Sequence, residues 1–284
     1  MAKRSKTGAQ GELVIIGAHE DKECCRTMLG EVAARAKSGM LLVMTLTSEE
    51  GMAQWKSYQR AFSDLGVKKV EHFELDSRPD SDVQRRMALV ERASLYFFAG
   101  GDQLRITSKF GGTEFCEVLR KRHTAGAAIA GTSSGASVLS ETMLVSGPGD
   151  DSHRVGDTLR MAPGIGLLDG IIIDQHFAER GRLGRLIGAV TQNPRLLGMG
   201  VDENTAVVMH KTEFVVTGAG AVYMVDASHM NYSNVSESKP DVTLAAHNIK
   251  LDLLGDGDTY DLERRLAFCA ERRSIAAGKG DGQT

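Results

Sequence analysis

The segment Gly131-Thr132-Ser133-Ser134-Gly135-Ala136 has the composition and surroundings of a site for covalent catalysis. An apolar run at 127–130 precedes it and a weakly apolar stretch at 138–139 follows, which predicts a buried strand, a tight turn and a helix start. A Gly-x-Ser-x-Gly turn in that context exposes a serine hydroxyl above a sheet. Ser133 is therefore a candidate nucleophile, and the Ser134 amide is a candidate donor to a developing oxyanion. The alternative is a turn of small residues that caps a helix.

A serine nucleophile needs a general base, and His176 has the best position among the histidines. It directly follows the apolar run 171–173, and functional groups collect at the carboxyl ends of parallel strands. The motif Asp202-Glu203-Asn204, which also follows an apolar run, offers an acid to orient the imidazole. A structural histidine and a hairpin turn are the alternatives for these two sites. The spacing permits a Ser-His-acid set and does not choose between the two carboxylates.

Three other histidines have simpler interpretations. His123 ends a basic helical segment, where a positive charge complements the helix dipole. His72 and His210 lie in expected strands among polar residues, which predicts exposed side chains for both.

Positioning the candidate groups requires strands that end at one edge of a sheet. In the first half of the chain, apolar runs alternate with amphipathic segments. We expect strands at 13–16, 40–45, 69–73, 95–98 and 127–130, and helices at 24–36, 52–65, 81–93 and 115–123. This rhythm predicts an α/β fold with a doubly wound, mostly parallel sheet that has helices on both faces. Glycine turns end strands at Gly17-Ala18, at Gly100-Gly101 and at the Ser133 turn.

The second half has a different pattern. The expected strand 171–173 leads into a basic helix at 179–191, and closely spaced short strands follow. These strands, at 197–201, 206–210, 213–216 and 221–225, predict extra antiparallel pairs. A surface loop is expected at 146–157. We expect a flexible tail at 1–10, a single catalytic domain at 11–265 and a partly disordered C-terminal tail at 266–284.

Composition excludes several classes of protein. The 284 residues are 42% hydrophobic and 25% charged, as in ordinary globular proteins. The net charge of −3 argues against a nucleic-acid binder, and no apolar run reaches the length of a membrane span. The four cysteines lack metal-ligand spacing and are interpreted as free thiols, and no zinc motif occurs. We therefore expect a cytoplasmic protein without a metal or other cofactor.

The chain closely resembles the cyanophycinases, which belong to the peptidase E-like serine peptidases, from about residue 12 to about residue 262. The resemblance lies in Ile15-Ile16-Gly17-Ala18-His19-Glu20-Asp21, Ala99-Gly100-Gly101-Asp102-Gln103-Leu104, the Ser133 segment, Asp174-Gln175-His176-Phe177 and Gly200-Val201-Asp202-Glu203-Asn204-Thr205. It implies a fold like that of class I glutamine amidotransferases. It also implies a triad in which Ser133 is the nucleophile, His176 the base and Glu203 the acid. The implied oxyanion hole consists of the amides at Gly100 and Gly101 and the amide of Ser134.

The resemblance also implies a substrate. Cyanophycinases are exopeptidases that cut cyanophycin (multi-L-arginyl-poly-L-aspartate) into β-aspartyl-arginine dipeptides through an acyl-enzyme. The branch of each unit carries a carboxylate, which the arginine forks of Arg180, Arg182 and Arg185 suit, with Gln103 and Gln175 beside them. Glu179 or Asp174 is the candidate partner of the branch guanidinium. The alternative is that the arginines form a solvated helix face. A homodimer is compatible with the resemblance.

Two positions depart from the family pattern. Ser134 stands where the family usually has alanine, and the opening motif has Ala18 in place of a glycine and His19 as an additional imidazole near the site. Other functions stay open, among them an aspartyl dipeptidase of the peptidase E type acting on small Asp-containing peptides, and a non-catalytic binding module. A glutamine amidotransferase is disfavoured because its nucleophile is cysteine.

Overall fold

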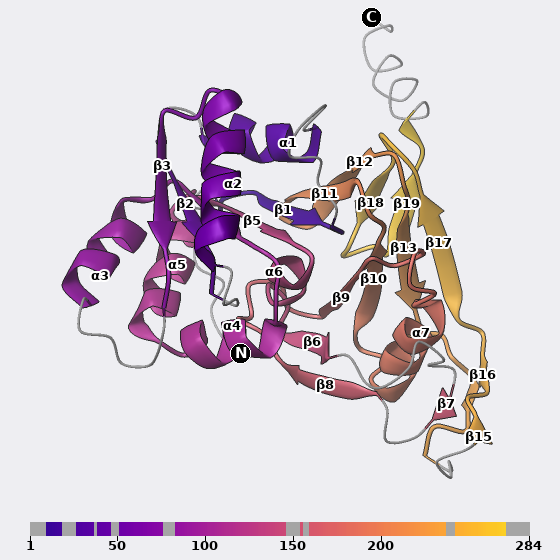
Figure 1. The fold of residues 1–284 in the computed structure, drawn as a ribbon. Helices are drawn as coiled ribbons and strands as arrows, with labels where there is room; N and C mark the ends of the chain where they lie inside the picture. Colours follow the sequence, from indigo (N-terminus) through magenta and orange to yellow (C-terminus); the bar gives the residue numbers. More distant parts are fainter. Residues whose placement is uncertain are drawn as a thin grey trace, which may run out of the picture.

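The structure is a computed structural model that describes residues 10–18, 27–36, 39–46, 51–75, 83–145, 154–155, 159–236 and 242–270. A nine-stranded sheet runs through it (Figure 1). Its strands are β1 (Leu13–Ile16), β2 (Met40–Met44), β3 (Lys69–Phe73), β4 (Leu95–Phe98), β5 (Ala128–Thr132), β11 (Thr205–His210), β12 (Glu213–Gly218), β18 (Thr259–Asp261) and β19 (Leu266–Phe268). Their order is β19-β18-β12-β11-β1-β5-β4-β2-β3.

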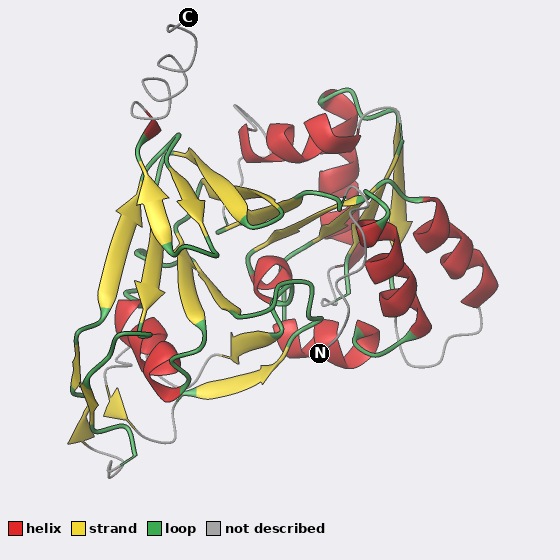
Figure 2. Ribbon diagram, turned by 180° about the vertical axis from the view of Figure 1, so that it is seen from behind, coloured by secondary structure: helices red, strands yellow, loops and turns green. Residues whose placement is uncertain are grey.

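The strands β1 to β5 pair in parallel and form the half of the sheet that carries helices on both faces. Their alternate residues enter two separate apolar clusters, because both faces are covered. Helices α1 (Thr27–Ala36) and α2 (Gly51–Asp64) pack on one face. Helices α3 (Val83–Arg92), α4 (Gln103–Phe110) and α5 (Glu114–Thr124) pack on the other (Figure 2). The expected α/β class is confirmed, and β11, β12, β18 and β19 extend the sheet as antiparallel strands.

A second sheet has the strand order β17-β13-β10-β9. It consists of β9 (Ile171–Gln175), β10 (Leu197–Val201), β13 (Val222–Asp226) and β17 (Lys250–Leu254). Side chains from its inner face, among them Ile173 and Met199, join the same buried cluster as Ile15 of the large sheet. Helix α7 (Leu183–Gln192) covers its outer face. The strand expected at 171–173 is β9, which pairs in parallel with β10 of this second sheet.

The remaining described elements are short. They are α6 (Ser134–Ser137), the pair β6 (Thr142–Val145) and β8 (Arg160–Pro163), the pair β7 (Arg154–Val155) and β15 (Val242–Thr243), and the pair β14 (Tyr232–Ser233) and β16 (Ala246–His247). The pair β6–β8 lies beside the Ser133 turn and forms part of the wall of the site, as described below.

Some expected boundaries were wrong. Helix α7 begins at Leu183, not at 179, because Gly181 takes a left-handed conformation with φ 60° and residues 177–182 form turns. Helix α4 was not expected; Asp102 begins it by accepting hydrogen bonds from the amides of Leu104 and Arg105.

The ends of the chain also differ in part from expectation. Strand β19 lies within the expected C-terminal tail and pairs with β18, so ordered structure continues to Phe268. Strand β7 lies within the expected loop at 146–157. Residues 1–9 and 271–284, together with His19, Cys24 and Cys25, lie outside the described residues. In the described part, Cys116 and Cys269 are free thiols.

Two of the three histidine expectations were wrong. His123 is buried, its Nδ1 lies 3.0 Å from the Ala127 carbonyl oxygen, and burial lowers its pKa, so it is not a helix-terminal charge. His72 is half-buried and stacks on Trp55 with 4.8 Å between ring centroids. Burial and the charge of Arg86 lower the pKa of His72. His210 is exposed, as expected.

Searched over the described residues, the fold contains no helix that is long and apolar enough to cross a bilayer.

Candidate active site

Ser133 lies at the point where β5 ends and α6 begins. Its backbone has φ 53° and ψ −126°, a conformation that costs free energy for any residue with a Cβ. Hydrogen bonds hold it on both sides: its amide donates to the Ile16 carbonyl at 3.0 Å, and its carbonyl accepts from the Ala136 amide at 2.9 Å. The strained conformation is therefore maintained by the strand before and the helix after, and Ser133 lines a pocket described below.

Glycines on either side of Ser133 permit this turn by close approach. A Cβ built on Gly131 would lie 2.2 Å from the Gly135 carbonyl oxygen, and one on Gly135 would lie 2.2 Å from that of Phe98. Real Cβ atoms essentially never approach backbone oxygens so closely, so both positions require glycine.

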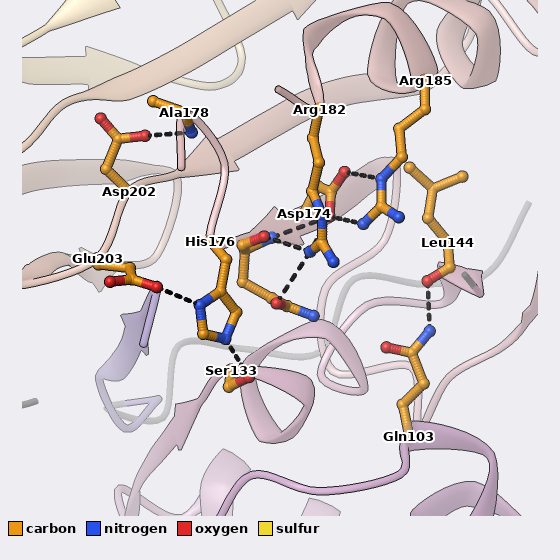
Figure 3. Close-up of polar contacts among 11 residues, drawn as sticks. Gln103, Ser133, Leu144, Asp174, His176, Ala178, Arg182, Arg185, Asp202 and Glu203 are labelled. Atoms are coloured by element: carbon orange, nitrogen blue, oxygen red, sulfur yellow. Dashed lines mark hydrogen bonds and ion pairs between the residues drawn. The ribbon is translucent and has the colours of Figure 1, made fainter. Parts of the chain in front are cut away.

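The side chains of Ser133, His176 and Glu203 come from three different segments between secondary-structure elements and contact one another. Ser133 Oγ lies 3.0 Å from His176 Nε2, and His176 Nδ1 lies 2.6 Å from Glu203 Oε1 (Figure 3). His176 directly follows β9 and has φ 48°; its amide donates to the Gly17 carbonyl at 3.2 Å. Glu203 lies in the turn between β10 and β11. The site therefore combines an end of the large sheet with an end of the second sheet.

The two neighbouring carboxylates have different partners. Asp202 is buried, and its oxygens accept from the amides of Ala178 at 2.9 Å and Ala221 at 3.0 Å. Glu203 accepts from the imidazole, and its own amide donates to Glu179 Oε1 at 3.1 Å. Asp202 thus ties two loops together, whereas Glu203 contacts His176.

The surroundings of His176 favour a neutral ring. Burial is the largest cause and lowers the pKa of His176 below the usual value. The hydrogen bond that the ring donates to Glu203 opposes this, and the positive charge of Arg180 adds to the lowering. A neutral imidazole can accept the proton of a serine hydroxyl.

The three amides expected to bind an oxyanion are not equivalent. Gly100 lies against Ser133, since a Cβ built on it would be 3.3 Å from Ser133 Cβ. The Gly101 amide donates to Ser134 Oγ at 2.8 Å, and the same hydroxyl donates to the Gly101 carbonyl. The Ser134 side chain therefore already occupies the Gly101 amide.

A buried carboxylate organises the arginines that follow His176. Asp174 is 1% exposed, and its Oδ2 accepts from Arg185 Nε at 2.6 Å. Its Oδ1 accepts from Arg182 Nη1 at 3.2 Å, and the same nitrogen lies 3.0 Å from Gln175 Oε1. Arg182 is 5% exposed. The interpretation of Arg182 and Arg185 as a solvated helix face is therefore wrong. Asp174 faces these arginines, not a guanidinium from outside.

The hydrogen-bonded set opens into a pocket of about 590 Å³. Most of the predicted site residues line it: Gly101, Gln103, Ser133, Ser134, Gln175, His176, Arg180, Arg182 and Arg185. Gln103, the first residue of α4, donates from its amide to the Leu144 carbonyl. Arg160 of β8 also lines the pocket. No local pattern indicated Arg160, because only the pairing of β8 with β6 brings it there.

Within the described part of the chain, no group of three or more His, Cys, Asp or Glu side chains is arranged to hold a metal ion. A second pocket of about 580 Å³ lies around Asn204 and Gly218 and lacks both Ser133 and His176. The two pockets have nearly the same volume, so volume does not identify the candidate active site. The polar side chains that line the pocket at Ser133 identify it.

A sequence model of peptidase family S51 matches residues 14–217. The chain belongs to peptidase family S51. It is 33% identical over 277 residues to the cyanophycinase of Trichormus variabilis, covering 95% of this chain and 92% of that protein. It is 34% identical over 260 residues to the cyanophycinase of Synechococcus elongatus, covering 90% and 80%. These relationships make it a serine peptidase.

Two solved structures share the fold. A peptidase from an acI-B1 Actinobacterium aligns with a TM-score of 0.61 and 21% identity, covering 85% of this chain and 96% of that one. A putative peptidase E protein from Listeria monocytogenes aligns with a TM-score of 0.53 and 14% identity, covering 75% and 100%.

The turn at Ser133 generates a prediction about stability. Gly131→Ala is expected to lower the free energy of unfolding by roughly 1–3 kcal/mol, because the new methyl group meets a fixed backbone oxygen. Gly30→Ala is the matched control: it lies in α1 with no heavy atom within 4 Å of the built Cβ. In Gly30→Ala, the higher helix propensity of alanine is expected to raise the free energy of unfolding by about 0.5–1 kcal/mol. Urea unfolding measures both, and an unchanged midpoint for Gly131→Ala would contradict the close-approach argument.

Proposed function

We propose that this peptidase hydrolyses cyanophycin as an exopeptidase and releases β-aspartyl-arginine dipeptides. The observation that carries the proposal is the contact chain Ser133–His176–Glu203 at the mouth of a pocket lined by arginines. The similarity to cyanophycinases along nearly the whole chain supports the choice of substrate.

In the proposed mechanism, neutral His176 accepts the proton of the Ser133 hydroxyl while Ser133 Oγ attacks a main-chain carbonyl carbon of the polymer. Glu203, hydrogen-bonded to Nδ1, stabilises the imidazolium that forms. The imidazolium then gives its proton to the leaving amine, the C–N bond breaks and an acyl-enzyme results. A water molecule, activated by the same histidine, hydrolyses the ester and regenerates the serine.

In this proposal the strained turn at Ser133 acts as a nucleophile elbow. The amides of Gly100, Gly101 and Ser134 are the proposed oxyanion donors. The Gly101 amide, which already donates to Ser134 Oγ, would have to exchange that partner to take part.

Substrate binding in the proposal rests on Arg180, Arg182 and Arg185, with Gln103 and Gln175. Their orientation suits a branch that ends in a carboxylate, because Asp174 fixes the planes of two guanidinium groups. Asp174 is buried and contacts these arginines, so it does not reach the substrate in this proposal. Exposed Glu179 is the remaining acidic candidate for binding the branch guanidinium.

The alternative activity is that of an aspartyl dipeptidase. Incubation with cyanophycin and, separately, with small Asp-containing dipeptides distinguishes the two, with products identified by mass. β-Aspartyl-arginine from the polymer supports the proposal; an intact polymer beside hydrolysed dipeptides contradicts it. A cytoplasmic location and a homodimer also stay predictions, and sedimentation analysis tests the second.

Ser133→Ala is expected to reduce kcat by at least about 10,000-fold, because the proposed acyl-enzyme forms on the Ser133 hydroxyl. Ser108→Ala, on the exposed face of α4, is the control and should keep parental turnover. Both proteins are compared by cyanophycin hydrolysis and by urea unfolding. Measurable turnover in a folded Ser133→Ala protein would eliminate the nucleophile assignment.

Glu203→Gln and Asp202→Asn separate the two carboxylates. The first is expected to lower kcat by roughly 100- to 10,000-fold with little change in unfolding, because the imidazole loses the acceptor that orients it. Asp202→Asn is expected to lower the urea midpoint of unfolding, because Asp202 holds two backbone amides, and to reduce kcat less than Glu203→Gln does. If Asp202→Asn reduces kcat further than Glu203→Gln does, the acid is Asp202.

The lowered pKa of His176 predicts the pH dependence of the free enzyme. Attack needs the neutral ring, so the rate rises with pH through the His176 pKa, and the midpoint of this rise should lie below 6.5. Removing a nearby positive charge makes the imidazolium easier to form, so Arg180→Ala should move the midpoint upward. The rate of Ser133 labelling by an uncharged fluorophosphonate, measured from pH 4.5 to 9, gives both midpoints. A midpoint that stays in place in Arg180→Ala would contradict the assigned cause.

A further inference from the structure

The pocket at Ser133 has a guanidinium group that neither a motif nor the resemblance indicated. Arg160 lies in β8, directly opposite Val145 of β6 in the antiparallel register. Residues directly opposite in such a pair point to the same face of the ribbon. Val145 and Arg160 both line the pocket, which agrees with this register. Arg160 therefore reaches the site from a part of the chain remote from the loop after His176.

The four arginines of the pocket fall into two pairs. Arg182 and Arg185 share the carboxylate of Asp174 and are mostly buried. Arg160 and Arg180 are exposed, and neither makes an ion pair with the described residues. Arg180 is close enough to His176 for its charge to lower the pKa of that ring. The first pair is thus held internally, whereas the second pair can meet a ligand.

The charge of the lining limits what that ligand group can be. Within the described residues, four arginines and one carboxylate, Asp102, line the pocket, and Asp102 Oδ1 accepts from two amides at the start of α4. Asp174 pairs with Arg182 and Arg185, so the charges of Arg160 and Arg180 exceed those of the carboxylates. Such a surface attracts an anion and repels a guanidinium. Each cyanophycin branch carries both groups, so the carboxylate end must be the one that enters.

We propose that Arg160, together with Arg180, binds the free carboxylate of the substrate branch, so that the pocket selects this carboxylate and not the guanidinium. The inference rests on the proposed function. It adds a specificity-determining residue from β8 to the arginines after His176, and it assigns the two pairs different tasks. Arg182 and Arg185 shape the pocket around Asp174, and Arg160 and Arg180 contact the ligand.

The test measures binding without turnover. The full chain with Ser133→Ala is titrated calorimetrically with a three-unit cyanophycin oligomer and with an analogue whose branches carry agmatine, which retains the guanidinium and lacks the carboxylate. Arg160→Ala, added to this protein, is expected to weaken binding of the oligomer by about 10- to 100-fold, the range of a charge-assisted hydrogen bond. Affinity for the agmatine analogue should stay the same or rise. Arg160→Lys should restore part of the loss, because an ammonium supplies the charge without the fork.

The matched control is Arg92→Ala at the exposed end of α3, which should change neither affinity. Equal losses for both oligomers, or an unchanged affinity for the cyanophycin oligomer in a folded Arg160→Ala protein, would overturn the inference. Cleavage of cyanophycin by the parent chain separates the two hypotheses. If the parent chain cleaves the polymer and Arg160→Ala leaves the preference for the cyanophycin oligomer over the agmatine analogue unchanged, the inference alone fails. If the parent neither cleaves the polymer nor binds the oligomer, both fail.

Discussion

The contact of one imidazole with two side chains is the constraint on which the site depends. Ser133 belongs to an end of the large sheet, and His176 and Glu203 belong to connections of the second sheet. Contacts of 3.0 Å and 2.6 Å leave little room for the sheets to slide against each other. The shared apolar cluster that contains Ile15, Ile173 and Met199 prevents such sliding, because close-packed side chains interdigitate in one arrangement. The core between the sheets therefore helps to fix the distances between Ser133, His176 and Glu203.

The carboxylate of Asp174 lies beside the pocket although it is almost inaccessible to solvent. A buried charge is costly unless it is paired and hydrogen-bonded, and Asp174 has both compensations. Asp174 holds the side chains of Arg182 and Arg185 in place before a ligand binds. Without it, these side chains would lose their rotamer freedom only at binding. Arginines held in advance leave less conformational entropy to lose at binding. In the proposed function, Asp174 therefore contributes to substrate binding by ordering Arg182 and Arg185.

The parts of this architecture that sequence patterns predict are the local ones. Apolar runs and amphipathic spacing identified the strands β1 to β5 and most helices, since both faces of a parallel sheet are buried. A short run such as 171–173 does not reveal its pairing partner, so the sequence did not indicate a separate second sheet. Gly181 shortened α7, and its left-handed conformation depends on the turn around it. Spacing alone also left Asp202 and Glu203 as equal candidates, because their different partners come from distant segments. The burial of Arg182 and the place of Arg160 likewise depend on tertiary contacts.

The hydroxyl of Ser134 shows how a single side chain can redistribute backbone donors. It accepts from the Gly101 amide and donates to the Gly101 carbonyl, so it satisfies two backbone groups of a residue whose φ of 150° suits glycine. A methyl group at this position could do neither, and the Gly101 amide would then be available to another acceptor. The change from the usual alanine therefore alters which amides beside Ser133 are open, although it leaves Ser133, His176 and Glu203 in contact. The proposed oxyanion donor at Ser134 is the backbone amide, so in this proposal the side chain acts only through the neighbouring turn. The number of free donors at the site thus depends on packing around Gly101 as much as on the serine turn.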